Sequence, residues 1–287
     1  MIDGRADARA EATIRLARLG GRMALAMFRE TPVSWKPDGS MLTDADMRIQ
    51  RRLETEITAL FPGDAMLGEE ETGAAGAGPD ARHCWVLDPI DGTNNFGRGM
   101  PGFTVSVGVL RDGLPWAGAV YDPVADHLFC ARRGSGAWLN GGRLSLSPAP
   151  LSARSLFSIR APFEDPVPEC VLRWLRRYRL RRIGSTALHL CYVAIGGLAF
   201  VHDHRASLWD VAGAALVLAE AGGLITRDDG TPLFPVALTR AHEPLAFIAG
   251  DPEAHRAALA DVERDAASRP PVAGRHRLPG HRRLDTA

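Results

Sequence analysis

The sequence contains little lysine, cysteine and tyrosine, and it has no long uninterrupted apolar run. Its 34 basic residues include a single lysine, Lys36, so arginine supplies almost all of the positive charge. The four cysteines are far apart and form no CxxC pair, which predicts reduced, partly buried thiols in a cytoplasmic protein. No run approaches the roughly 18 apolar residues of a membrane span, and the N-terminus lacks a signal-peptide core. We therefore expect no membrane partner.

An excess of charge of either sign is also absent. The chain has 34 basic and 34 acidic residues and a formal net charge of zero, which argues against a broad nucleic-acid-binding surface. At 287 residues and 46% apolar content it can bury a sizeable core, as one large domain or two closely packed ones. A Pro-rich stretch at 147–150 predicts an N-terminal α+β subdomain over 1–147 and a C-terminal α/β subdomain over 148–267. Residues 268–287 are predicted to form a disordered basic tail.

Apolar periodicity predicts both helices and strands along the chain. One amphipathic helix is expected over 4–30, and a second follows Thr43, with Ile49, Leu53 and Ile57 on one face. Strands joined by short turns over 103–132 predict an antiparallel part of a sheet. Beyond residue 150, alternating strands and helices predict an α/β layer with crossover connections. The elements expected there are 155–159, 169–177, 180–183, 185–195, 198–202, 211–221, 245–249 and 252–265.

The stretch from Trp85 to Phe96 begins as a buried strand and is predicted to end in a tight acidic turn. Asp88 and Asp91 lie three residues apart across Pro89, which stiffens the backbone from which they emerge. Two carboxylates held close repel each other unless a cation lies between them. Oxygen-only ligands suit Mg²⁺ or Mn²⁺ better than zinc. A structural Asx-turn is the alternative interpretation.

Three further acidic positions lie next to predicted helix or strand ends. Asp46 falls in the first turn of the second helix, Glu69 follows a short strand over 65–67, and Asp210 opens an apolar helix. Each has a structural alternative, as a helix cap, a complement to the helix dipole or a solvated edge. One turn cannot encircle two ions, however, and these positions together with the acidic turn provide four separate segments.

Taken in order, these pieces resemble the inositol monophosphatase family, the lithium-sensitive, Mg²⁺-dependent phosphatases. The resemblance covers roughly residues 8 to 265 and implies alternating α-β-α-β-α layers, usually assembled as a homodimer. The matching segments are Asp46, Gly68-Glu69-Glu70, Asp88-Pro89-Ile90-Asp91-Gly92-Thr93 and Trp209-Asp210-Val211-Ala212-Gly213.

The resemblance implies a cage for two or three Mg²⁺ ions, for which Mn²⁺ could substitute. Glu69, Asp88 and the carbonyl of Ile90 would hold the first ion. Asp88 would bridge to a second ion, held also by Asp91 and Asp210. Glu69 would be catalytic as well, through a more weakly bound third ion.

The resemblance also implies roles around the reacting phosphate. Asp46 and Thr93 would orient or deprotonate the attacking water, and the amides of Gly92 and Thr93 would meet the phosphate. Lys36 is expected to be a site residue because a compact ammonium suits water and carboxylate contacts. Asp203, seven residues before Asp210, is the predicted acceptor for the leaving group.

The predicted function is that of a Mg²⁺-dependent phosphomonoesterase acting on a small-molecule phosphate ester, with inositol 1-phosphate as the first candidate. Asn94 and the 202–208 segment depart from the inositol enzymes, so histidinol phosphate, fructose bisphosphate and 3′-phosphoadenosine 5′-phosphate stay open as substrates. A catalytically silent regulatory relative is the alternative from another class. An HxH metal pair at His202 and His204 is the weakest alternative, because no further His or Cys ligand is nearby.

Overall fold

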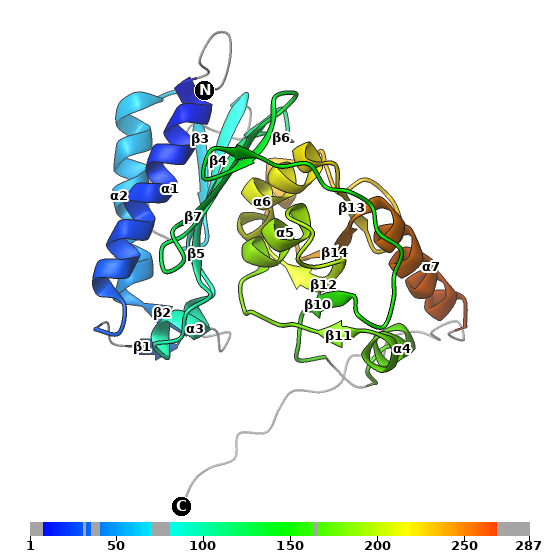
Figure 1. Cartoon of the computed structure of the whole chain (residues 1–287). Coiled ribbons are helices and arrows are strands. Elements are labelled where there is room, and N and C mark those ends of the chain that lie inside the picture. Colours follow the sequence, from blue (N-terminus) through cyan, green and yellow to red (C-terminus); the bar gives the residue numbers. More distant parts are fainter. Residues whose placement is uncertain (1–7, 31–32, 36–40, 71–80, 164–165, 269–287) are drawn as a thin grey trace, which may run out of the picture.

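The computed structural model describes residues 8–30, 33–35, 41–70, 81–163 and 166–268, which form five layers in the order α-β-α-β-α. Figure 1 shows α1 (Ala8–Met27) and α2 (Asp44–Leu60) on the outer face of the first sheet. Between the two sheets lie α5 (Thr186–Ala194) and α6 (Leu208–Ala221), and α4 (Glu169–Arg177) and α7 (Pro252–Ser268) cover the far side. This arrangement confirms the predicted fold class.

The first sheet contains seven strands in the order β3-β4-β5-β6-β7-β8-β9. β3 is parallel to β4, and the other neighbours are antiparallel, as the short turns predicted. The bounds are β3 Ala65–Gly68, β4 His83–Asp91, β5 Thr104–Arg111, β6 Leu114–Asp122, β7 His127–Arg132, β8 Gly136–Leu139 and β9 Gly142–Arg143.

The second sheet contains five strands in the order β11-β10-β12-β14-β13. β10 runs parallel to β11 and β12, which fits the predicted crossovers, whereas β14 is antiparallel to both of its neighbours. The bounds are β10 Leu156–Ile159, β11 Arg179–Leu180, β12 Phe200–Ala206, β13 Leu224–Arg227 and β14 Leu245–Gly250. A separate antiparallel pair, β1 (Val33–Trp35) and β2 (Met41–Thr43), and the 3₁₀ turn Leu238–Arg240 had no periodic signal.

Two local predictions were wrong. The strand expected over 180–183 ends at Leu180, because the Ile183 amide donates to the ring of His189 instead of to a neighbouring strand. The turn expected after Asp91 is a single residue, Gly92, which has φ 100° and leads directly into a short helix, α3 (Thr93–Gly97). Positive φ favours glycine, and a Cβ at Gly92 would lie 2.9 Å from the Gly102 carbonyl.

Close packing of α6 on the first sheet brings the two halves of the molecule together. A Cβ at Gly118 on β6 would lie 2.5 Å from the Gly213 carbonyl on α6, so glycine is needed at this crossing. Buried side chains of α5 and α6, among them Leu190 and Val217, fill the space between the sheets. This contact carries the start of α6 to the end of β4. None of the described helices is long and apolar enough to cross a membrane.

Candidate active site

The end of β3 places Glu69 beside the acidic end of β4. Gly68 pairs with Leu87 in the parallel ladder, and the Glu69 amide donates to the Leu87 carbonyl at 3.1 Å. Asp88 is the next residue of β4, so the two carboxylates come from adjacent strands. Gln50 of α2 holds the following residue, Glu70, by accepting a hydrogen bond from its amide at 2.9 Å and donating to its carbonyl.

The backbone of β4 is irregular between Asp88 and Asp91, where the register with β5 shifts. Asp88 Oδ1 accepts a hydrogen bond from the Ile90 amide at 3.0 Å, so the Asx-turn considered from the sequence is present within the acidic segment. Asp88 and Asp91 are 1% and 7% exposed. The structural and functional interpretations of this segment are therefore compatible.

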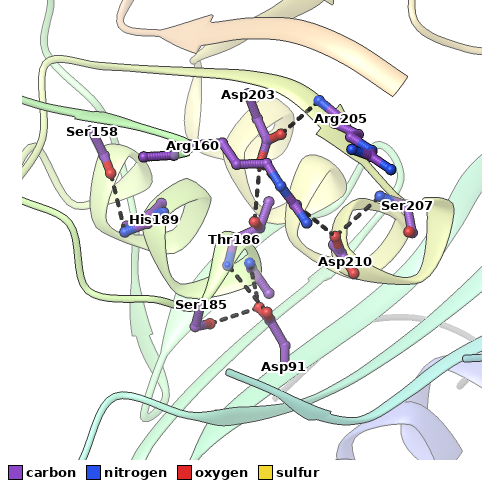
Figure 2. A network of polar contacts seen from close by, with 12 residues as sticks. Asp91, Ser158, Arg160, Ser185, Thr186, His189, Asp203, Arg205, Ser207 and Asp210 are labelled. Atoms are coloured by element: carbon purple, nitrogen blue, oxygen red, sulfur yellow. Dashed lines mark hydrogen bonds and ion pairs between the residues drawn. The ribbon is translucent and has the colours of Figure 1, made fainter. Parts of the chain in front are cut away.

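Asp91 points at the start of α5. It accepts hydrogen bonds from the Ser185 hydroxyl at 2.6 Å, the Thr186 amide at 3.2 Å and the Ala187 amide at 2.6 Å (Figure 2). The first amides of a helix have no partner inside it, and its N-terminal end favours negative charge. The second half of the chain thus fixes a carboxylate of the first half.

Asp210 lies in the first turn of α6, where its Oδ2 accepts a hydrogen bond from the Ser207 amide at 3.0 Å. Asp203, on β12, is 3% exposed and accepts hydrogen bonds from the Thr186 hydroxyl at 3.1 Å and the Arg205 amide at 3.0 Å. Figure 2 shows the Arg160 side chain reaching toward both aspartates. Asp210 therefore completes the capping box at the start of α6, whose N-cap is Ser207, and also lines the cleft.

Asp46, in the first turn of α2, and Thr93, at the start of α3 directly after the acidic segment, lie beside each other. Asp46 Oδ2 accepts hydrogen bonds from the amide and the hydroxyl of Thr43, at 2.8 and 2.6 Å, while Oδ1 lies 3.5 Å from the Thr93 hydroxyl. The same hydroxyl donates to the Ile90 carbonyl at 2.9 Å. Asp46 thus completes the capping box at the start of α2, whose N-cap is Thr43, and is also directed at Thr93.

A single cleft with a volume of about 1860 Å³ joins most of the predicted site residues. They come from β4, the loop after β3, α3, β12 and α6, and it is the second sheet and its helices that close the far wall. Asp46 is fully buried behind Thr93, and Lys36 lies outside the described residues. The predicted residues that line the cleft are Glu69, Asp88, Ile90, Asp91, Gly92, Thr93, Asp203 and Asp210.

The site carboxylates are deprived of water and face one another. Burial raises the pKa of Asp46 to about 7 and that of Asp91 to about 6. Burial, followed by the charge of Glu69, raises the pKa of Asp88 well above its usual range. Burial and the charge of Asp91 do the same for Asp210. A cation in the cleft would relieve both effects, because it stabilises the ionised carboxylates that desolvation and like charge destabilise.

The donor set fits a hard divalent cation. Glu69, Asp88, Asp91 and Asp210 supply carboxylate oxygen, and Ile90 supplies a carbonyl at the same cleft. In the described part of the chain, no three His, Cys, Asp or Glu side chains stand close enough together to form a ready-made metal cage. His202 and His204 do not form a pair: His202 packs edge-on against Trp174, and His204 stacks on Phe163 with ring centroids 4.8 Å apart.

Three residues that contact the site carboxylates or the segment beside them were missed in the sequence. Gln50 could have been found, because Asp46, Gln50 and Glu54 are polar residues repeated every four positions along the buried side of α2. Arg160 and Ser185 carry no comparable local signal, since their partners Asp210 and Asp91 lie 50 and 94 residues away. The sequence predicts a helix that begins at Ser185, and Gly184-Ser185-Thr186 is similar to the family, but neither signal identifies Asp91 as the partner of Ser185.

Comparison with known proteins places this site in context. The model of the inositol monophosphatase family matches residues 8–266. The chain is 31% identical over 261 residues to the protein named Nus factor SuhB of Pseudomonas aeruginosa, covering 87% of this chain and 94% of that one. It is 32% identical over 237 residues to an inositol-1-monophosphatase of Mesorhizobium japonicum, covering 76% and 84%. The crystal structure of the extragenic suppressor protein suhB from Bartonella henselae aligns with a TM-score of 0.79 at 28% identity, covering 90% of this chain and 99% of that one.

Proposed function

Because this chain belongs to the inositol monophosphatase family, a family of phosphatases, we propose that it is a Mg²⁺-dependent phosphomonoesterase acting on a small phosphorylated metabolite. The observation that carries the proposal is the convergence on one cleft of carboxylates from separate segments, namely Glu69 after β3, Asp88 and Asp91 on β4, and Asp210 on α6. A catalytically silent regulatory relative would be expected to lack at least one of these side chains, and all of them are present.

The metal-holding roles follow from the donor set. Glu69, Asp88 and the Ile90 carbonyl would hold the first Mg²⁺, and Asp88, Asp91 and Asp210 the second, with Glu69 shared by a third ion. The ions would neutralise the phosphate dianion, activate water near neutral pH and stabilise the leaving oxygen. Mn²⁺ would substitute, since it accepts the same oxygen ligands.

The protein's own side chains would place the attacking water. Asp46 is fully buried directly behind Thr93, where burial raises its pKa to about 7 in the absence of metal, and this position makes it the candidate proton acceptor. Its Oδ2 is committed to Thr43, which leaves Oδ1 directed at the Thr93 hydroxyl 3.5 Å away. A water on the cleft side of Thr93 would be oriented by that hydroxyl and could lose its proton toward Asp46. The amides of Gly92 and Thr93 at the start of α3 would bind the phosphate.

Inositol 1-phosphate is the substrate we propose first, since a relative with 32% identity is named inositol-1-monophosphatase. Asp203 lines the cleft across from the acidic turn and would contact the leaving group there. Its oxygens already accept hydrogen bonds from Thr186 and Arg205, so a substrate hydroxyl would have to share these acceptors. Histidinol phosphate is the second candidate because its ammonium also suits a carboxylate.

Phosphate release from a panel of phosphate esters, with and without Mg²⁺, tests the proposal. The panel should include inositol 1-phosphate, histidinol phosphate, fructose bisphosphate, 3′-phosphoadenosine 5′-phosphate and a simple aryl phosphate. Turnover that requires a divalent cation and disappears in Asp88→Asn supports the phosphatase. A folded protein that releases no phosphate from any ester would favour the regulatory relative, in line with the relative named as a Nus factor.

Selectivity across the same panel tests the leaving-group contact. Asp203→Ala should reduce the preference for inositol 1-phosphate over the aryl phosphate.

We also propose a homodimer, on the family resemblance alone. Sedimentation equilibrium should give twice the chain mass of 30.9 kDa, and a monomer at micromolar concentration would contradict it.

A further inference from the structure

Arg160 places a positive charge inside the acidic cleft. It directly follows β10, and its Nη1 lies 3.5 Å from Asp203 Oδ2 and 3.7 Å from Asp210 Oδ2 (Figure 2). The Arg160 side chain is 38% exposed, whereas those of the two aspartates are 4% and 13% exposed. One guanidinium therefore bridges a strand and a helix of the cleft while keeping contact with solvent.

These contacts neutralise charge without fixing the guanidinium. Both distances fit ion pairs but are longer than the 2.7–2.9 Å or so of a charge-assisted hydrogen bond. The carboxylates have other partners that hold them in place: Thr186 and Arg205 donate to Asp203, and the Ser207 amide donates to Asp210. Arg160 can therefore leave without releasing either aspartate from its position.

Asp210 is also the side chain that the proposed function assigns to the second metal ion, and this inference rests on that assignment. A divalent ion bound by Asp210 and the guanidinium, whose Nη1 lies 3.7 Å from Asp210 Oδ2, would repel each other and compete for the charge of the same carboxylate. We propose that Arg160 is an internal cation that occupies the Asp210 position until the second ion binds, and that must withdraw toward solvent when it does. The Arg160 charge allows the protein to fold around its buried carboxylates without metal. It also lowers the affinity for the second ion relative to the affinity for the first.

Direct metal binding separates this role from an effect on turnover. Mn²⁺ alone, titrated by calorimetry into the full-length protein after EDTA treatment, should fill the first and second positions in two steps, a tighter and a weaker one, before any third ion binds. Arg160→Gln should tighten the weaker step about tenfold, because the competing charge is gone, and should leave the tighter step nearly unchanged. Arg160→Lys, which keeps a charge on a different head group, should lie between wild type and Arg160→Gln. Arg179→Gln, an exposed arginine on β11 outside the cleft, is the matched control and should bind like wild type.

Thermal unfolding gives a second readout. Arg160→Gln should melt at a lower temperature than wild type in EDTA, because removal of the cation leaves buried carboxylates uncompensated, and should gain more from added Mn²⁺. Should Arg160→Gln not fold in EDTA, Arg160→Lys still tests the order of affinities.

Two results would overturn the inference: one would leave the proposed metal site intact, and the other would remove it as well. A weaker step that is unchanged or weakened in Arg160→Gln would make Arg160 a support of Asp210 and not a competitor, with the metal site intact. No saturable Mn²⁺ binding in any of the proteins, wild type included, would remove the proposed metal site and the inference with it.

Discussion

Gln50 and Glu70 form a two-way hydrogen bond, in which the Glu70 amide donates to Gln50 Oε1 and Gln50 Nε2 donates to the Glu70 carbonyl. Both residues are buried, and Gln50 also donates to Glu54 on the same helix. The segment that leaves β3 is thus tied to α2 immediately beside Glu69. The position of a proposed metal ligand depends on an uncharged side chain of another layer.

Gln50→Ala should weaken metal binding although it changes none of the proposed metal-binding residues. Loss of both bonds frees the backbone around Glu69, so the Mg²⁺ concentration for half-maximal activity should rise about tenfold, and the orphaned polar groups should cost roughly 1–3 kcal/mol of unfolding free energy. Mg²⁺ titration of phosphate release and urea unfolding measure the two effects. Arg51→Ala, at an exposed neighbour on α2, is the control. An unaltered Mg²⁺ requirement in a destabilised Gln50→Ala would limit Gln50 to stability.

Asp88→Asn, Asp91→Asn and Asp210→Asn should each lower kcat by at least about 10³-fold while the protein stays folded. Each change removes one charge from the proposed metal cage, and several kcal/mol of transition-state stabilisation is the expected scale. Asp112→Asn is a matched control, because Asp112 is exposed and has φ 52°, a conformation that asparagine also adopts. Near-wild-type turnover in any of the three at saturating Mg²⁺ would contradict the proposed site.

Thr93→Ala should depress kcat by about 100-fold and change KM little, because orientation of the attacking water acts mainly in the transition state. Thr93→Ser retains the hydroxyl that faces Asp46 and should recover most of the rate. Steady-state kinetics on the best ester of the panel measure both. If KM rises in Thr93→Ala while kcat holds, the hydroxyl binds phosphate and does not orient water.

Without metal, the contribution of Asp46 and Asp91 to stability should fall as pH rises from about 4 to about 7, against an opposite contribution from the buried His189 and His202, whose pKa values burial lowers to about 4. The pKa values of Asp46 and Asp91 in the folded state, about 7 and about 6, lie above the ordinary value of 3.8. At these two carboxyl groups the native protein therefore holds more protons than the unfolded chain in this window. The stabilisation is fully present below the ordinary pKa of 3.8. It is lost as pH rises through about 6 and about 7, the pKa values of Asp91 and Asp46 in the folded protein. For Asp46 the loss is on the order of 4 kcal/mol.

Urea unfolding in EDTA between pH 5 and pH 8 measures this slope. Asp46→Asn should remove the Asp46 share of the fall and Asp112→Asn should not, and saturating Mg²⁺ should also reduce the fall because a bound cation stabilises the ionised carboxylates. An identical pH dependence for wild type and Asp46→Asn in EDTA would mean that Asp46 is already ionised in the native protein without metal.

Lithium should inhibit by competing for one of the Mg²⁺ positions, an expectation that comes from the family resemblance. A monovalent ion fits an oxygen cage but cannot replace the divalent charge that stabilises the leaving group. Activity measured at fixed Mg²⁺ with increasing LiCl, against NaCl at equal ionic strength, tests this. Equal responses to the two salts would show that the second metal position differs from that of the family.

The sequence by itself predicted a set of candidate site residues and the kind of element that presents each of them. Asp88, Asp91 and Asp210 were recognisable because each lies at the end of a strongly patterned element, where a short motif and its flanking Pro or Gly act locally. Helix α4 was predicted with its observed bounds, Glu169–Arg177, for the same reason. Periodicity reports which face of an element is buried, and it needs no knowledge of the element's neighbours.

Only the tertiary structure decided what these residues touch. Asp91 is held by the start of α5, Glu69 by way of Gln50, and Asp210 is paired with Arg160. Such contacts join residues that are far apart in the chain, and they depend on how the layers stack, which no local pattern encodes. The raised pKa values have the same origin, because desolvation and the proximity of like charges exist only once the two sheets and their helices have closed over the cleft.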